Sequence, residues 1–169
     1  MVFNMAKYQF KGLDEYAQYL QKIGKNTPEI LGAGVYTMAD IVTNEVRKAL
    51  DALPAVEEKF AVAAYKNGTQ TSLTKSQKKG LQNSLGISGM QNDNGFLNVK
   101  IGFDGYNNVR TRTYPKGQPN ALIARATESG SSVRKKTPFI RPAVNASKKQ
   151  AIDSCKVVID EKIYALEKK

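Results

Sequence analysis

A run of apolar residues at helical spacing, bounded by two prolines, constrains the fold of this chain more than any other feature. Thr27 can cap a helix, Pro28 suits the first helical position and Glu29 complements the positive end of a helix. Seven apolar residues then recur on one face with a mean step of about 3.7, namely Leu31, Val35, Met38, Val42, Val46, Ala49 and Leu53. Pro54 ends the pattern. We therefore predict a long helix over 28–53, which needs a sheet or another helix against its apolar face.

Two shorter helices are predicted on either side of this one. Apolar residues recur at steps of three and four over 13–23, which indicates a helix that ends near Gly24. The polar segment Thr74–Leu85 also has a helical pattern, with Thr74 or Ser76 as its cap.

The second half of the chain mixes a strand, a long loop and two helices. Alternating apolar and polar residues over 97–103 predict a half-buried strand, after turn residues over 89–95. Residues 104–120 are rich in Gly, Asn, Arg and Tyr and predict a long loop, of a kind that is usually functional or mobile. A short helix over 121–128, ended by a glycine, and a C-terminal helix over about 142–167 complete the chain.

The apolar run 60–65 fits either a buried strand or a short helix, and periodicity alone does not decide between them. With 169 residues the chain is long enough to bury a core, and no repeat or linker divides it. We expect a single domain over 1–169.

The segment after the short helix combines two prolines with an apolar pair. Proline fixes φ at two points, the apolar pair offers an anchor between them, and the second proline suits the first turn of the following helix. This predicts a docking element that either packs the C-terminal helix within the chain or contacts a neighbouring chain. Its residues are Pro138, Phe139, Ile140, Arg141 and Pro142.

The net charge of +11 is concentrated in one third of the chain. Residues 106–141 carry eight basic side chains and one acidic side chain, a net of +7, whereas residues 1–60 carry seven basic and eight acidic. A basic patch of this kind could meet nucleic acid, an acidic protein surface or only water. The candidate patch residues are Arg110, Arg112, Lys116, Arg125, Arg134, Lys135 and Lys136.

The residues that most enzymes and metal sites use are scarce. The chain has no histidine and a single cysteine, Cys155, so the commonest general base is missing and a zinc site is excluded. The spacing Ser-x-x-Lys, which could make a hydrolase nucleophile, begins at Ser72, Ser76 and Ser132 without the motifs that accompany it in acyl transferases. We expect no catalytic residue, no metal and no cofactor. No apolar run approaches the roughly 20 residues that span a bilayer, and no signal peptide is recognisable.

Several motifs follow one another in an order that points to a family. The long helix ends in Leu-Pro, and the other motifs are Phe-Lys-Gly-Leu-Asp-Glu at 10–15, Lys-Gly-Leu-Gln-Asn-Ser-Leu-Gly-Ile at 79–87, Ile-Gly-Phe-Asp-Gly-Tyr at 101–106, Glu-Ser-Gly at 128–130 and Pro-Phe-Ile-Arg-Pro-Ala at 138–143. Over nearly the whole chain, this order resembles the tail-completion proteins (neck, or head–tail joining proteins) of tailed bacteriophages and prophages. The last motif is the most specific part.

The resemblance implies a virion structural protein with an α+β fold, in which long amphipathic helices pack on a small antiparallel sheet. Copies would form a ring, and a hexamer would match the symmetry of tail tubes. The ring would join the tail tube or tail terminator to the head connector, around a channel through which DNA passes without sequence recognition. Assembly would take place in the cytoplasm of the host bacterium, without a membrane or a small-molecule substrate. A basic nucleic-acid-binding protein is the alternative that the charge suggests.

Overall fold

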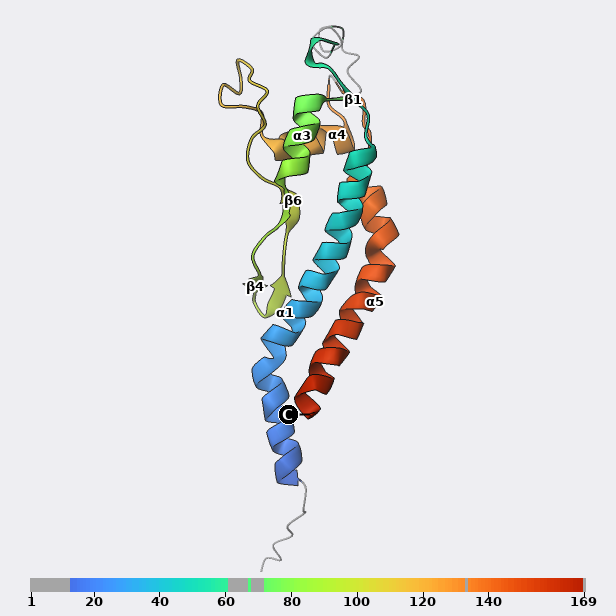
Figure 1. Ribbon diagram of the computed structural model, residues 1–169. Coiled ribbons are helices and arrows are strands. Elements are labelled where there is room, and N and C mark those ends of the chain that lie inside the picture. The colour runs from blue at the N-terminus through green and yellow to red at the C-terminus, as the bar shows by residue number, and fades with distance from the viewer. Residues whose placement is uncertain (1–12, 61–66, 68–71, 133, 169) are drawn as a thin grey trace, which may run out of the picture.

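Two long antiparallel helices form the body of the molecule (Figure 1). The computed structural model describes residues 13–60, 67, 72–132 and 134–168. Helix α1 spans Leu13–Ala52 and helix α5 spans Ile140–Glu167. At a rise of about 1.5 Å per residue, α1 is about 60 Å long. Its first turns extend beyond the end of α5.

The sequence predicted two helices where α1 is continuous, so the predicted break near Gly24 and the start at Pro28 are wrong. A proline inside a helix leaves one carbonyl without its usual donor. Neighbouring side chains donate to two carbonyl oxygens of the preceding turn: the Thr27 hydroxyl to that of Ile23 at 2.9 Å, and the Asn26 amide to that of Lys22 at 2.8 Å.

Helix α5 also holds α1 on both sides of Pro28. The Lys22 ammonium donates to the carbonyl oxygen of Leu166 at 3.1 Å, and Lys162 forms an ion pair with Glu29 at 3.2 Å. Because these contacts bridge the proline, tertiary packing overrides the local signal for a helix start. The Thr27-Pro28-Glu29 pattern is typical of a helix start, but contacts with the distant helix α5 cannot be read from it.

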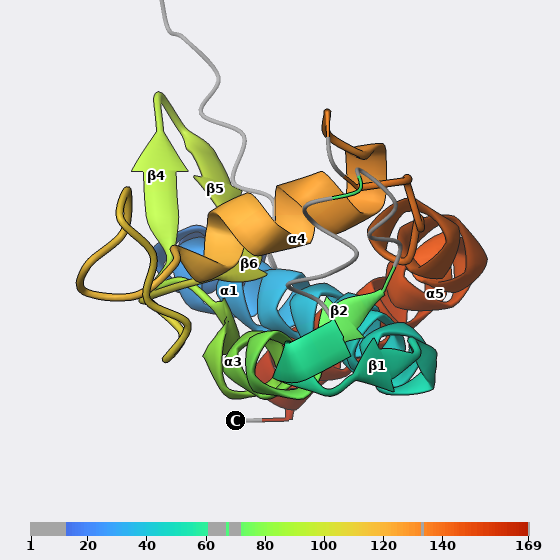
Figure 2. The same ribbon diagram turned by 90° about the horizontal axis from the view of Figure 1, so that it is seen from above.

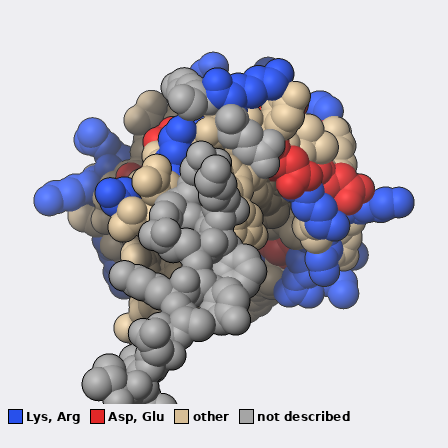
Figure 3. All heavy atoms as spheres, turned by 90° about the horizontal axis from the view of Figure 1, so that it is seen from below, with Lys and Arg blue, Asp and Glu red and all other residues tan. Residues whose placement is uncertain are grey.

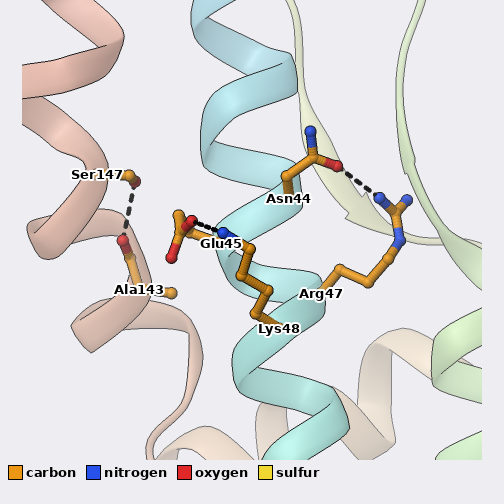
Figure 4. A network of polar contacts seen from close by, with 6 residues as sticks. All are labelled: Asn44, Glu45, Arg47, Lys48, Ala143 and Ser147. Atoms are coloured by element: carbon orange, nitrogen blue, oxygen red, sulfur yellow. Dashed lines mark hydrogen bonds and ion pairs between the residues drawn. The ribbon is translucent and has the colours of Figure 1, made fainter.

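Small residues line the seam between the two helices. Apart from Ile30, the buried seam consists of small residues: Gly34, Ala39 and Thr43 on α1 and Ala143, Ser147 and Ala151 on α5. Ser147 donates its hydroxyl to the carbonyl oxygen of Ala143 at 2.8 Å. On α1 beside it, Lys48 pairs with Glu45 and Arg47 donates to Asn44, both within the helix (Figure 4). Small side chains allow the helix axes to approach closely, so they are buried in preference to larger ones.

The predicted apolar stripe of α1 is therefore only partly covered. Val46 is buried, but Val35, Met38 and Val42 are half-buried and Leu31 is exposed. On α5, likewise, Ala151 is buried and its larger neighbour, Ile152, is 39% exposed. These side chains leave an open apolar surface beside the seam.

Helix α3 (Lys75–Ser84), helix α4 (Asn120–Ser129) and, within the described residues, six short strands surround the upper half of α1 (Figure 1). The strands are β1 (Ala55–Val56), β2 (Leu73–Thr74), β3 (Leu85–Ile87), β4 (Gln91–Asp93), β5 (Phe96–Asn98) and β6 (Ile101–Phe103). β1 pairs with β2 in parallel, whereas β3 with β6 and β4 with β5 form antiparallel pairs. This confirms the predicted single-domain α+β arrangement of a long helix packed on small antiparallel sheets.

The core lies where α1, α3, α4 and the start of α5 meet. Its buried residues are Val46, Leu50, Leu73, Leu81, Leu85, Ile123, Ala124, Phe139 and Ala143. Every helix of this region contributes to the cluster, so the Pro-Phe-Ile-Arg-Pro segment is anchored in the core at the point where α5 begins.

Of the two caps predicted for α3, Thr74 and Ser76, the structure uses Thr74. The Gln77 amide N–H donates to the Thr74 hydroxyl at 3.1 Å, and the Gln77 side chain accepts the Thr74 N–H at 3.2 Å, which is a capping box. Helix α4 ends at Gly130, whose φ of 82° favours glycine. Of the ambiguous run 60–65, Phe60 is helical and the other residues lie outside the described part.

The single strand predicted over 97–103 is divided between β5 and β6, and the preceding turn segment contains β4. Asn94 and Gly95 form the two-residue turn between β4 and β5, with φ of 53° and 93°. Positive φ at both positions is typical of the turns that match the twist of a hairpin. The Asn92 side chain accepts the Gly95 N–H at 2.8 Å and fixes the turn further.

Candidate functional site

The carboxylate of Glu128 joins the end of α4 to the start of α5. Glu128 is 8% exposed. One of its oxygens accepts the N–H groups of Phe139 at 2.7 Å and Ile140 at 2.8 Å, and the other accepts that of Arg141 at 3.1 Å. The Glu-Ser-Gly motif and the Pro-Phe-Ile-Arg-Pro motif therefore form one contact, which we call the Glu128 joint.

The Glu128 joint satisfies the whole N-terminal end of α5. The first four N–H positions of a helix have no partner inside the helix. In α5 these belong to Phe139, Ile140, Arg141 and Pro142; Glu128 takes the first three, and proline has no N–H to satisfy. The negative charge also lies at the positive end of the helix dipole. A side chain distant in sequence thus replaces the local cap that Phe139 cannot supply.

The surroundings of Glu128 favour the charged form of its carboxyl group. Burial alone raises the pKa of a carboxyl, but the backbone N–H groups of Ile140, Phe139 and Arg141 and the nearby Arg141 guanidinium lower it, and the net pKa of Glu128 is below its ordinary value. The Arg141 Nε lies 3.8 Å from the carboxylate and its side chain is 78% exposed, so the N–H groups are the main contacts.

The five candidate docking residues separate into an inner and an outer set. Phe139 is 2% exposed and packs edge-on against Phe103, with ring centroids 6.1 Å apart. Ile140 is half-buried against the core. Pro138, Arg141 and Pro142 are exposed. The anchor therefore packs α5 within the chain, and the outer three residues face solvent.

Arg134, which the sequence assigned to the exposed basic patch, is 6% exposed. Its guanidinium donates to Gln77 at 2.9 Å and to the Thr127 hydroxyl at 3.3 Å, and Gln77 in turn donates to Gln118 at 2.8 Å. Burial lowers the pKa of Arg134. The side chain lies inside because it connects α3, α4 and the long loop, a role that no local pattern could indicate.

The other six candidate basic residues are exposed, but they do not form one cluster. Arg110, Arg112 and Lys116 belong to the loop before α4, whereas Lys135 and Lys136 follow it, and Arg125 lies on α4 itself. Ten residues of helix, about 15 Å, separate the two groups. Figure 2 shows the loop and the following segment at opposite ends of α4. Seen from below, Lys and Arg side chains lie around the rim of the molecule (Figure 3).

The predicted long loop is ordered by two buried asparagines that the sequence analysis did not single out. The Asn107 side chain accepts the Val109 N–H at 2.9 Å, and the Asn120 side chain donates to the Asp104 carbonyl at 2.9 Å. Both pack against Gly80 of α3, where an added Cβ would lie 2.6 Å from the Cβ of Asn107. An open pocket of about 750 Å³ lies beside them. The asparagine-rich composition was the only signal.

Within the described residues, no group of three or more His, Cys, Asp or Glu side chains is placed to hold a metal ion. In the same part of the chain, no helix is long and apolar enough to cross a bilayer. Fold and site together define a single-domain α+β protein whose sequence motifs meet at a helix–helix joint. Comparisons with protein-family models, with curated proteins and with solved structures give no match for this chain.

Proposed function

We propose that the chain is a structural subunit of a tailed-phage or prophage particle, a neck or tail-completion protein. It assembles as a ring, most simply a hexamer, that joins the tail tube to the head connector around the DNA channel. Assembly takes place in the host cytoplasm, and the product stays in the virion. The fold class agrees with this proposal, and the motifs described above suggested it.

The Glu128 joint carries the proposal. The most specific motif of the resemblance, Pro-Phe-Ile-Arg-Pro-Ala, follows a short loop after Glu-Ser-Gly, and the two motifs meet in three hydrogen bonds to one carboxylate. Their co-occurrence therefore has a physical reason: each motif needs the other to begin α5. The joint also leaves Pro138, Arg141 and Pro142 on the surface, where a partner can reach them.

The experiment is deletion of the gene in a phage or prophage that encodes it, followed by electron microscopy of the lysate. We expect filled heads and separate tails that do not join, or tails with aberrant ends. Complementation with the wild-type gene should restore joined particles, and complementation with Arg141→Ala tests the exposed part of the joint. Normal infectious particles after deletion would overturn the proposal.

The exposed loop before α4 favours one further function, contact with nucleic acid. Arg110, Arg112 and Lys116 are all exposed on it, and such residues bind phosphates with an affinity that falls steeply with salt. In the neck proposal this contact is made with DNA in the channel. As the alternative, the protein binds nucleic acid on its own.

A further inference from the structure

An open apolar groove of about 350 Å³ lies between α1, α5 and the β5–β6 strands. Val35, Met38 and Val42 line it from α1, Leu97 and Ile101 from the strands, and Ile152 from α5. These side chains are half-buried or exposed. Three of them belong to the stripe that the sequence predicted to be covered by another element, so the chain alone leaves that cover incomplete.

The β4–β5 hairpin carries the most exposed of the large apolar side chains described. Phe96 is 78% exposed, directly after the two-residue turn. Asp93 is its register partner on β4, so both side chains lie on the same face of the hairpin. Figure 2 shows the hairpin projecting from the body, away from α5. We call Phe96 and Asp93 the hairpin knob.

Phe96 of the hairpin knob and Leu97 of the groove lie on opposite faces of β5, while Asn98, which also lines the groove, donates to Asp93 of the knob. Successive side chains of a strand point to opposite faces, and Leu97, the neighbour of Phe96, lines the groove. A projection and a recess formed by different residues of one chain are a surface pair of the kind that joins copies head to tail. Such a contact closes into a ring when its rotation allows.

Charge matches across this pair as well. Lys148 lines the groove, is exposed and forms no ion pair within the described part of the chain. Asp93 is exposed too, and the Asn98 amide donates to its carboxylate at 3.0 Å. The knob of one copy therefore offers the Phe96 ring beside the Asp93 carboxylate, and the groove of another copy offers an apolar recess beside the Lys148 ammonium.

We propose that the hairpin knob of one copy docks in the groove of the next, with Phe96 in the apolar recess and Asp93 against Lys148. This inference rests on the proposed ring and identifies its subunit interface. It also assigns a partner to the half-covered stripe of α1.

Crosslinking between two single-cysteine variants tests the contact. Phe96→Cys and Ile152→Cys are made separately in a Cys155→Ser background, mixed and oxidised, so that any joined pair comes from two chains. We expect a disulfide-linked dimer. Phe96→Cys mixed with Tyr164→Cys is the control, because Tyr164 is exposed on α5 but does not line the groove. Crosslinking no stronger than in the control would overturn the proposal.

Charge exchange tests the ion pair by a different measurement. Asp93→Lys and Lys148→Asp each place two like charges together and should weaken self-association by about tenfold in analytical ultracentrifugation, and the double variant should recover most of the loss. Phe96→Ala should weaken it further, whereas Tyr164→Ala should not. Circular dichroism checks that each variant folds. Equal association of all variants, or a wild type that stays monomeric at every concentration, would contradict this interface.

The two proposals fail separately. If gene deletion leaves heads and tails unjoined but the knob variants assemble normally, the neck function stands and the interface is wrong. If the variants lose self-association while deletion leaves infectious particles, the interface stands and the neck function is wrong.

Discussion

Glu128 shows how one residue can determine where a distant helix begins. Glu128→Ala leaves the N–H groups of Phe139, Ile140 and Arg141 without their acceptor, partly out of reach of water. We expect the free energy of unfolding to fall by about 2 kcal/mol, as for the loss of a helix cap with charged hydrogen bonds. Urea denaturation at neutral pH measures this. Glu161→Ala, exposed on α5, is the control and should change little.

The lowered pKa of Glu128 also predicts how the joint responds to pH. A carboxyl whose pKa is lower in the folded state stabilises the fold above its unfolded pKa, about 4.3. That contribution is lost as the pH falls through the lower, folded pKa. Glu128→Gln keeps an acceptor but cannot titrate, so the stability difference from wild type should shrink in acid. A difference that stays constant down to pH 2 would contradict this account.

Arg134 makes a second prediction for a single residue. Its replacement by alanine removes the donor that connects Gln77 to Thr127 and leaves a space inside the network. We expect a loss of about 2 kcal/mol in unfolding free energy, whereas Lys135→Ala, the exposed neighbour, should stay within about 0.5 kcal/mol. Thermal denaturation of the two variants compares them directly. Equal effects would mean that the guanidinium is not held inside.

The sequence anticipated some of these residues and not others. Phe139 could be chosen as an anchor because an apolar side chain between prolines is a local pattern. Glu128 was visible as part of a motif, but its three partners lie eleven to thirteen residues away, and only the fold brings them together. Arg134 was assigned by its charge to the surface, since burial of a guanidinium depends on partners from other elements.

Among the elements, the α1–α5 seam depends on the absence of a side chain at Gly34. A Cβ built there would lie 2.8 Å from Cys155 Sγ and 3.0 Å from a side-chain carbon of Ile159. Gly34→Ala should therefore destabilise the protein by about 1–2 kcal/mol, since the crowding outweighs the gain in helix propensity. Gly24→Ala, in the same helix with nothing within 4 Å of its added Cβ, should stabilise by about 0.5–1 kcal/mol.

A double-mutant cycle tests whether the contact with Cys155 Sγ causes the destabilisation by Gly34→Ala. In a Cys155→Ala background the nearest obstacle is gone, so Gly34→Ala should cost less than in the wild type. Identical costs in both backgrounds would show that Cys155 Sγ does not limit the seam. Guanidinium denaturation of the four proteins supplies the values.

The sequence predicted that helices form in the regions of α1 and α5. It did not predict that α1 continues through Pro28, or which face of α1 is buried. The cap at Thr74 and the stop at Gly130 are local chemistry and were confirmed. Pro28 carries an equally good local signal, yet α5 holds the chain helical through it. The buried face shifted because close packing at Gly34 favours small residues over the larger apolar stripe.

At the scale of the whole molecule, the basic side chains are dispersed over the surface. This dispersion predicts the affinity, the sequence preference and the salt dependence of nucleic-acid binding. Exposed cations lie at both ends of α4, and others, such as Lys25 and Lys162, lie on the long helices α1 and α5. We expect weak affinity for DNA without sequence preference, falling steeply between 50 and 200 mM salt. Neutralising Arg110, Arg112 and Lys116 together should reduce the salt dependence more than neutralising Lys135 and Lys136. Fluorescence anisotropy with duplexes of different sequence measures both effects.

The part of α1 that extends beyond α5 has a consequence for the free protein. Below the Lys22 contact with Leu166, the first turns carry Tyr16 and Leu20 more than half exposed. Their backbone amides should exchange with deuterated solvent orders of magnitude faster than those of Val46 and Leu50, which lie in the core. If the backbone amides of these turns exchange more slowly in assembled particles than in the free protein, another protein chain covers them there. This measurement needs no substitution.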